Sequence, residues 1–253
     1  MGNISALKPL RYALDQINIP KGKVLILHIR LSPLKDLIGL DYSKLTNLIL
    51  QLLEKYKPKS ILVPAFTYSF TKSGLFHQIY SRSETGRFSE EVRNNFSKYR
   101  TPDPIFSMLD VKNWLGKQKD INCLVAFERG CIWEKLLNEE SIIINIGLDT
   151  LVATQIHYLE RLMDVPYRKI INKTGLIYKD KEVFEPVDYV FYARDFNNLR
   201  KLNWPLIEKK LLSVGVLNKF VWEGINFCSL LVPSLHKILA IEISRDPYYL
   251  VGK

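Results

Sequence analysis

The stretch Lys23-Val24-Leu25-Ile26-Leu27-His28 decides the fold, because a short apolar run of this kind is typical of a buried strand. Apolar residues then recur at helical spacing over residues 42–56. A second apolar run, Ile61-Leu62-Val63-Pro64, ends at its proline. Strand, helix and strand in this order predict a βαβ unit with parallel strands and a right-handed connection.

The same reasoning extends the pattern along the chain and predicts an α/β fold. Residues 1–253 are expected to form one domain, with a central mixed sheet flanked by helices. Further strands are predicted at 121–127, 142–146, 189–192 and 237–242, helices at 90–96, 132–137, 155–163 and 204–214, and a hairpin turn at Lys179-Asp180-Lys181 between strands 175–178 and 182–185.

Residues 64–107 differ from the rest of the chain, because they are polar, aromatic and rich in turn residues. A long irregular segment within a compact domain is usually a binding loop or disordered. The aromatic residues argue against disorder. This segment is therefore predicted to be an insertion that faces the substrate.

Composition narrows the class of protein. No apolar run reaches the length of a membrane span, and the N-terminus lacks a signal-peptide core, so a soluble cytoplasmic protein is expected. Three cysteines without CxxC spacing indicate neither a disulfide framework nor a metal site. Cys131 is interpreted as a small buried residue rather than a nucleophile.

The formal net charge of +10 needs a partner or a solvated surface to explain it. No helix-turn-helix, ribonucleoprotein or zinc-finger signature points to nucleic acid. Attraction of phosphorylated small molecules fits the charge equally well, and a solvated basic surface is the third interpretation.

The histidine that carries most information is His157, in Thr154-Gln155-Ile156-His157-Tyr158-Leu159-Glu160. It follows the predicted strand 142–146 by a short loop, which places it at the carboxyl edge of the sheet, where open α/β folds bind ligands. Glu160 shares a helix face with it and is suited to orient the imidazole. The alternative is a helix-capping histidine beside an unrelated glutamate.

Four segments in order resemble the aminoglycoside 3-N-acetyltransferase family. Their positions are 27–31, 62–67, 86–107 and 147–168, and they include Leu62-Val63-Pro64-Ala65-Phe66-Thr67, Thr154 to Glu160, and Val165-Pro166-Tyr167-Arg168. The chain departs from the family pattern in three places. Ile29 and Arg30 stand where the family has serines, and Asp103 stands where it has a histidine.

The resemblance implies an acyltransferase with acetyl-CoA or another acyl-CoA as co-substrate and direct transfer to an amine. His157 is then expected to be the general base. Glu160, Asp103 and Glu90 are the candidate carboxylates that orient His157 or grip the substrate. Predicted cofactor contacts are His28, Ile29, Arg30, Leu31, Thr67 and Ser107, and no metal is expected. His77 and His236 lie outside the matched motifs and are interpreted as structural or surface residues.

The charge favours one kind of acceptor within this family. A chain at +10 is badly matched to a polycationic aminoglycoside, since like charges repel in the encounter and in the site. A nucleotide-linked amino sugar, acylated with an acetyl or hydroxybutyryl group, is therefore the predicted substrate. Aminoglycoside 3-N-acetylation is the alternative within the class, and a non-catalytic basic nucleotide- or nucleic-acid-binding protein is the alternative from another class. Oligomeric state has no signature in the sequence.

Overall fold

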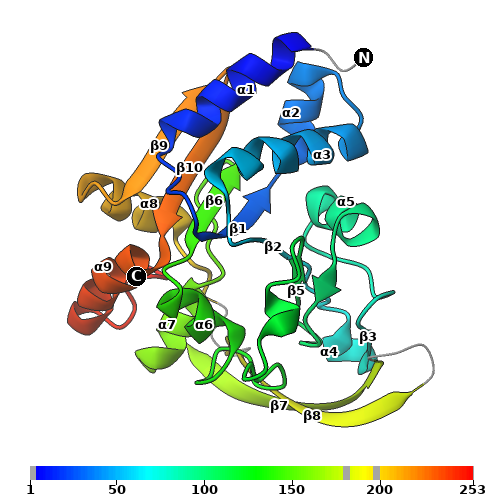
Figure 1. The fold of residues 1–253 in the computed structure, drawn as a ribbon. Coiled ribbons are helices and arrows are strands. Elements are labelled where there is room, and N and C mark those ends of the chain that lie inside the picture. Colours follow the sequence, from blue (N-terminus) through cyan, green and yellow to red (C-terminus); the bar gives the residue numbers. More distant parts are fainter. Residues whose placement is uncertain (1–3, 179–182, 196–199, 253) are drawn as a thin grey trace.

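A central mixed sheet with helices on both faces organises the chain, as Figure 1 shows for the computed structural model. The structure describes residues 4–178, 183–195 and 200–252. Among them, seven strands form the large sheet in the order β4-β5-β2-β1-β6-β10-β9, and three form a smaller sheet in the order β3-β7-β8. The strands are β1 (Val24–Ile29), β2 (Ser60–Pro64), β3 (Leu75–His77), β4 (Tyr99–Arg100), β5 (Met108–Asp110), β6 (Ile142–Ile146), β7 (Arg168–Tyr178), β8 (Phe184–Arg194), β9 (Leu217–Trp222) and β10 (Ile225–Leu231).

Most helices cover the two faces of the large sheet, and the short helix α4 contacts β7 of the smaller sheet. The helices are α1 (Ile4–Gln16), α2 (Leu31–Ile38), α3 (Tyr42–Leu53), α4 (Phe70–Ser73), α5 (Arg87–Asn95), α6 (Ile132–Asn138), α7 (Ile156–Leu162), α8 (Trp204–Ser213) and α9 (Val232–Arg245), with 3-10 turns η1 (Glu54–Tyr56) and η2 (Leu115–Lys117). In the part of the chain with described coordinates, no helix is both long and apolar enough to cross a membrane.

The middle of the large sheet is parallel, and this geometry positions the site. β1 pairs in parallel with β2 on one side and with β6 on the other. The carboxyl ends of these three strands therefore meet at one edge of the sheet. β5 pairs antiparallel with β2, and β10 with β6, so their amino ends reach that same edge. Segments that follow β1, β2 and β6 are brought together there.

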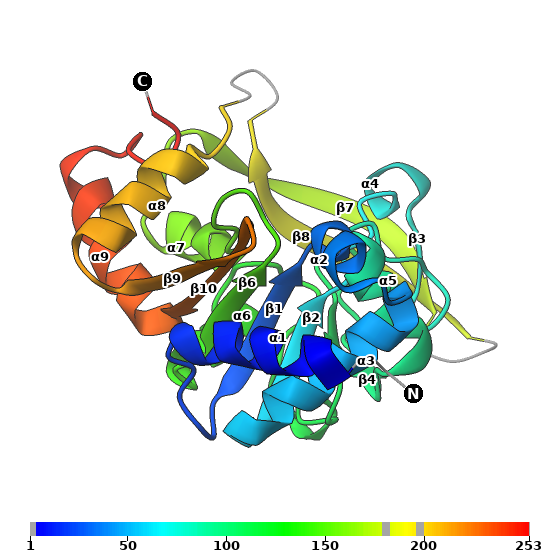
Figure 2. The ribbon, with the colours of Figure 1, turned by 90° about the horizontal axis from the view of Figure 1, so that it is seen from above.

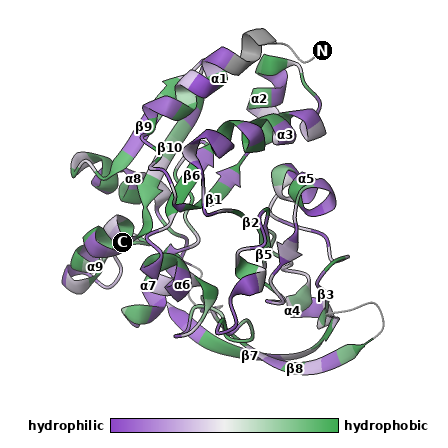
Figure 3. Ribbon diagram, viewed as in Figure 1, coloured by the Kyte–Doolittle hydropathy of each residue, from purple (hydrophilic) through white to green (hydrophobic). Residues whose placement is uncertain are grey.

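The two faces of the sheet bury different helices. The alternation of side chains sends Leu25, Leu27 and Ile29 into an apolar cluster with residues of α1, α2, α3 and α5. Val24 and Ile26 point to the other face, into a cluster with residues of α6, α7, α8 and α9. Figure 2 shows these two helix layers on opposite sides of the sheet, and Figure 3 shows hydrophobic and hydrophilic residues alternating along α1 and α3.

The smaller sheet is built around a long hairpin. β7 and β8 pair antiparallel from Arg168↔Arg194 to Tyr178↔Phe184, and β3 adds in parallel to β7. Tyr189 and Phe191 of β8 belong to the same apolar cluster as the buried residues of α6 and α7. The hairpin is therefore anchored to the face of the large sheet that carries α7.

The predicted mixed-sheet α/β fold and its βαβ unit are confirmed, whereas two predicted strands are wrong. Residues 237–242 lie inside α9, where Pro233 near its start and buried residues at helical spacing favour a helix. Residues 121–127 form no strand and contribute one bridge, Val125↔Val190. The predicted turn Lys179-Asp180-Lys181 lies outside the described residues.

The segment 64–107 has more regular structure than its composition indicated. It contains α4, β3, α5 and β4. Short elements of two to nine residues, separated by turns, lack the long periodic runs on which strand and helix predictions depend.

Candidate functional site

The candidate site lies where β6 ends and α7 begins. Gly147 follows β6 with φ of +73°, and a Cβ at this position would lie 2.4 Å from the backbone oxygen of Arg30. Only glycine suits both the left-handed backbone and this close approach. The chain then turns into α7, and His157 is the second residue of that helix. The predicted place of His157, after a strand at the carboxyl edge, is the one observed.

Glu160 and Arg168 surround one ring nitrogen of His157. His157 Nδ1 lies 2.7 Å from Glu160 Oε2, one helical turn away, which is within hydrogen-bond distance. Arg168, the first residue of β7, forms an ion pair with the same carboxylate oxygen, Nε to Oε2 at 2.6 Å. Arg168 Nη2 also lies 2.8 Å from His157 Nδ1. Because Nδ1 is engaged, Nε2 is the nitrogen left for a substrate.

Burial fixes the charge of each group. Glu160 is fully buried and the Arg168 side chain is 6% exposed. Burial alone would raise the pKa of Glu160, but the close contacts with His157 and Arg168 outweigh it and hold that pKa below its usual value. Burial lowers the pKa of His157, and Arg168 lowers it further against the opposing effect of Glu160. The site therefore holds an ionised carboxylate beside a neutral imidazole at neutral pH.

His157 forms part of the wall of a cavity of about 720 Å³. Its other walls come from the segment after β2, from β8 and from the start of α8. The described lining residues are Tyr68, Thr71, Ile105, Phe106, His157, Arg168, Phe191, Tyr192, Ala193, Arg194, Lys201, Leu202 and Trp204. Three of them, Arg168, Arg194 and Lys201, are cationic, and no aspartate or glutamate is among the described lining residues. The cavity is therefore mostly apolar with a positive potential.

Asp103 is not among the residues that line this cavity, but it binds two that are, Ile105 and Phe106. A single oxygen, Oδ1, accepts hydrogen bonds from the backbone N–H groups of Ile105 and Phe106 and from the hydroxyl of Tyr189, at 3.0, 2.6 and 2.7 Å. Burial raises the pKa of Asp103 to about 6, against the effect of these donors. Asp103 fixes two lining residues and contacts neither His157 nor Glu160.

Glu90 is engaged elsewhere. Its carboxylate forms a two-pronged ion pair with Arg93, at 2.9 and 2.6 Å, and accepts from the backbone N–H of Ser83 at 2.9 Å. The hydrogen bonds from Arg93 lower the pKa of Glu90 to about 2. Glu90 thus ties α5 to the loop before it, apart from the wall that carries His157.

Thr67 and Ser107 share a buried arginine. Arg100 donates from Nη2 to Thr67 Oγ1 and from Nε to Ser107 Oγ, both at 2.9 Å. Both hydroxyls also donate to backbone oxygens, Thr67 to Arg82 and Ser107 to Ala65. The two residues predicted to contact the cofactor hold the ends of β2 and β5 together, and their role toward a cofactor stays a prediction.

The predicted cofactor segment 28–31 joins β1 to α2. Ile29 and Leu31 are buried, whereas Arg30 is exposed and forms an ion pair with Asp149 at 3.1 Å. Burial lowers the pKa of His28 to about 4, and its Nε2 is buried without a hydrogen-bond partner in the described part of the chain. The residues lie at the same sheet edge as His157, and their predicted contacts with a cofactor stay predictions.

The thiol interpretation agrees with the structure. Cys131 is buried, and burial raises the pKa of its thiol to about 11, which disfavours a nucleophilic thiolate.

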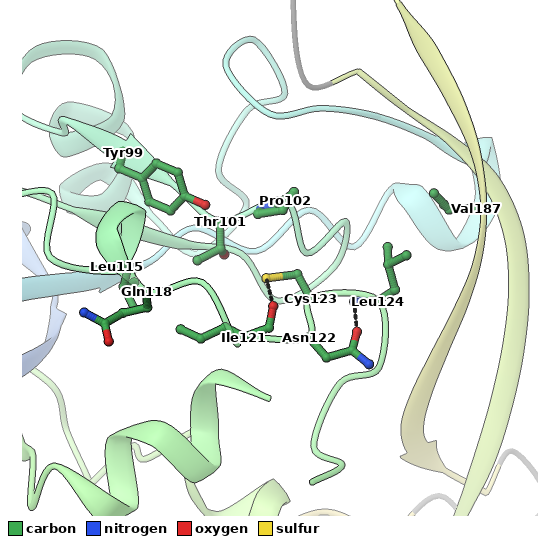
Figure 4. Close-up of a pocket in the computed structure, with 10 residues that line it drawn as sticks. All are labelled: Tyr99, Thr101, Pro102, Leu115, Gln118, Ile121, Asn122, Cys123, Leu124 and Val187. Carbon is green, nitrogen blue, oxygen red and sulfur yellow. Dashed lines mark hydrogen bonds between the residues drawn. The ribbon is translucent and has the colours of Figure 1, made fainter. Parts of the chain in front are cut away.

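A second cavity of about 280 Å³, shown in Figure 4, is lined by Thr101, Pro102 and Cys123 among others. Its described lining contains none of the predicted site residues, so the cavity at His157 is the better candidate for the reaction.

Three cationic lining residues had no predicted role. Arg168 lies within the Val165-Pro166-Tyr167-Arg168 motif, and its position in a matched motif was the signal that could have found it. Arg194 and Lys201 lie outside the four segments that resemble the family, and only the tertiary fold brings them to the cavity that His157 lines.

Comparisons with known proteins show the family and the fold of this chain. The chain matches a model of the family described as aminoglycoside 3-N-acetyltransferase over residues 54–218. No curated protein matches the chain. Similar solved structures include AAC-IIIb in a binary complex with CoASH, with 13% identity over 94% of this chain and 96% of that one at a TM-score of 0.71.

Two more similar structures extend the comparison. A mutant of aminoglycoside acetyltransferase AAC(3)-IVa in complex with a gentamicin has 13% identity over 100% of this chain and 92% of that one, with a TM-score of 0.72. The YokD protein from Bacillus subtilis has 16% identity over 95% and 93%, with a TM-score of 0.70. At these identities the solved structures show the fold, and the match over residues 54–218 shows the family: this chain belongs to the aminoglycoside 3-N-acetyltransferase family, whose members are N-acetyltransferases.

Proposed function

We propose that this protein is an acyl-CoA-dependent N-acyltransferase in which His157 accepts a proton from the acceptor amine. The supporting observation is a neutral imidazole that lines the cavity and lies beside the buried, ionised carboxylate of Glu160. The amine nitrogen attacks the thioester carbonyl, the C–N bond forms as the C–S bond breaks, and CoA leaves as the thiolate. The amine proton passes to Nε2 of His157. The complex of AAC-IIIb with CoASH supports CoA as the co-substrate.

We further propose that the acceptor is an anionic amine, of which a nucleotide-linked amino sugar is the best example. The charged side chains of the cavity wall, Arg168, Arg194 and Lys201, are cationic, and no carboxylate belongs to its described lining. Such a wall attracts a pyrophosphate and repels additional positive charge. The net charge of +10 acts in the same direction at longer range.

An aminoglycoside is the second candidate acceptor, and the comparisons favour it. The family model carries this activity in its description, and similar structures are described as bound to a gentamicin or to sisomicin. Against it stands the cavity, because an aminoglycoside is a polycation and would meet Arg168, Arg194 and Lys201 with no carboxylate from the described wall.

The segment 64–107 is proposed to supply one side of the acceptor site within a single domain. Tyr68, Thr71, Ile105 and Phe106 come from it and line the cavity together with residues of β8. These side chains set the depth of the cavity, so exchanging them should change which acyl chain is accepted.

One assay separates the two acceptors. Thiol release is measured with acetyl-CoA and 3-hydroxybutyryl-CoA against kanamycin, gentamicin and a panel of nucleotide-linked amino sugars. We expect turnover with a nucleotide-linked sugar and little with the drugs. Turnover of a drug without turnover of any anionic amine would replace the first acceptor by the second. No thiol release with any amine, together with salt-sensitive binding of nucleic acid, would support the non-catalytic alternative.

A further inference from the structure

The contacts around Nδ1 of His157 cannot all be favourable at once. Nδ1 lies 2.7 Å from Glu160 Oε2, a hydrogen-bond acceptor, and 2.8 Å from Arg168 Nη2, a donor. A neutral imidazole carries one N–H group, so Nδ1 either donates to Glu160 or accepts from Arg168. The two possibilities correspond to the two tautomers of the ring.

The two tautomers differ in their ability to accept a proton. When Nδ1 donates to Glu160, Nε2 presents its lone pair toward the cavity and acts as a base. When Nδ1 accepts from Arg168, the hydrogen is on Nε2, which then has no lone pair for the amine. The partner of Nδ1 therefore decides whether His157 is ready to react.

The arrangement without substrate favours Arg168 as that partner. The oxygen that faces Nδ1, Glu160 Oε2, is already paired with Arg168 Nε at 2.6 Å, so its negative charge is compensated. The approach of Nη2 to Nδ1 adds a charge-assisted hydrogen bond. Arg168 also lines the cavity together with Arg194 and Lys201, so an anionic group that enters the cavity can reach its guanidinium.

We propose that Arg168 holds His157 in the non-basic tautomer until an anionic group of the acceptor draws the guanidinium away from Nδ1. Nδ1 then takes up a proton from solvent and donates it in a hydrogen bond to Glu160, while the proton on Nε2 passes to solvent. The ring stays neutral, and the lone pair of Nε2 becomes available as the base. Arg168 is thus a positioning residue that makes base activation depend on the charge of the bound acceptor. This inference rests on the proposed function for the identity of the acceptor, but the tautomer of the free protein does not depend on it.

The charged groups that face His157 come from three elements. Glu160 is on its own helix α7, Arg168 is on β7 and Arg194 is on β8. Arg194 lines the same cavity and forms no hydrogen bond with His157, which makes Arg194→Lys the matched control for Arg168→Lys. Lysine keeps the positive charge at each position but removes the planar fork that places one nitrogen on Glu160 and another on Nδ1.

The tautomer is measured by nitrogen NMR of protein labelled at histidine, with the His157 signals assigned from a His157→Gln sample. We expect the free wild-type protein to carry its hydrogen on Nε2 and Arg168→Lys to carry it on Nδ1, while Arg194→Lys stays like wild type. Uridine diphosphate at millimolar concentration is expected to convert wild-type His157 to the Nδ1–H form. Thermal unfolding of each variant checks that it is folded.

Two results overturn the proposal. One is a free wild-type protein that already carries the hydrogen on Nδ1, a result that needs no variant to fold. The other is a wild-type spectrum that uridine diphosphate leaves unchanged. Thiol release is recorded separately, so the two proposals can fail independently. A tautomer that changes with uridine diphosphate, without turnover of any nucleotide-linked sugar, contradicts only the proposed acceptor. Turnover of such a sugar without a change of tautomer contradicts only the control of His157 by Arg168.

Discussion

Replacing Asp103 by asparagine should stabilise the protein at neutral and alkaline pH. Asp103 is 3% exposed, and its Oδ1 accepts all three hydrogen bonds described for the side chain, from Ile105, Phe106 and Tyr189. Asparagine has the same shape and retains Oδ1, so these three bonds survive in Asp103→Asn. The substitution removes the charge and leaves the acceptor in place.

The magnitude follows from the pKa. Burial raises the pKa of Asp103 from 3.8 to about 6, a shift of about two units, or roughly 3 kcal/mol at about 1.36 kcal/mol per unit. Because the folded pKa is above the unfolded one, the contribution of Asp103 to stability is fully present below the unfolded pKa. It is lost as the pH rises through about 6. We compare the free energy of unfolding of Asp103→Asn with that of wild type. This difference should shift in favour of the variant by up to about 3 kcal/mol between about pH 4 and alkaline pH.

Urea denaturation of wild type and Asp103→Asn, repeated from about pH 4 to about pH 8, measures this difference directly. Titratable groups common to both proteins cancel in the comparison. The difference between the two free energies of unfolding should therefore grow between the unfolded pKa of Asp103, 3.8, and its folded pKa of about 6. A difference that stays flat, or grows in the opposite direction, would refute the reasoning. Thiol release should stay within roughly ten-fold of wild type, because the lining residues Ile105 and Phe106 remain fixed; loss of turnover in a folded variant would give Asp103 a role in the reaction itself.

Three other predictions concern activity, backbone geometry and acid stability. His157→Asn should reduce turnover by roughly 10²- to 10⁴-fold while calorimetry shows CoA binding retained, and unchanged turnover would remove His157 from the mechanism. Gly147→Ala should lower the free energy of unfolding by about 1–3 kcal/mol, because the added Cβ would lie 2.4 Å from the Arg30 carbonyl oxygen. Gly215→Ala is the control for backbone strain alone, since Gly215 has a similar φ of +71° and no atom within 4 Å of an added Cβ. Equal losses of stability in the two variants would contradict the clash. Burial lowers the pKa of His236 to about 4, so the contribution of this residue to stability is present above about pH 6.5 and is lost as the pH falls toward 4. His236→Gln should therefore lose less stability in acid than wild type in the same urea assay. Identical pH profiles of the two proteins would contradict this prediction.

The parts of the fold that local pattern predicts are those with strong and unbroken signals. β1, β2 and β6 are short apolar runs buried on both faces, and α3 has a clear helical period. Residues 237–242 were predicted as a strand because Ile238, Leu239, Ala240 and Ile241 form a consecutive apolar run. A run of this kind does not show which of its residues are buried, so it does not distinguish a strand from a helix such as α9.

The candidate site divides in the same way. His157 and Glu160 are three residues apart on one helix, so their contact follows from local geometry. Arg168, Arg194 and Lys201 reach the cavity through the β7–β8 hairpin and the entry to α8, and their approach depends on tertiary packing. Glu90 stands in a matched motif, and its partner Arg93 is three residues further along the same helix, so this ion pair also follows from local geometry.

The contact between α1 and β9 has a consequence for synthesis of the chain. Leu10, Ala13 and Leu14 of α1 are fully buried, Tyr12 stacks edge-on with Phe220 of β9 at 5.8 Å, and Ser229 donates to the Ile17 carbonyl across 212 residues of sequence. At about 5–20 residues per second, a ribosome needs roughly 10–40 s between these segments. During that interval the part of the first helix that contacts β9 lacks its native cover, so the N-terminal helix completes its packing only late in synthesis.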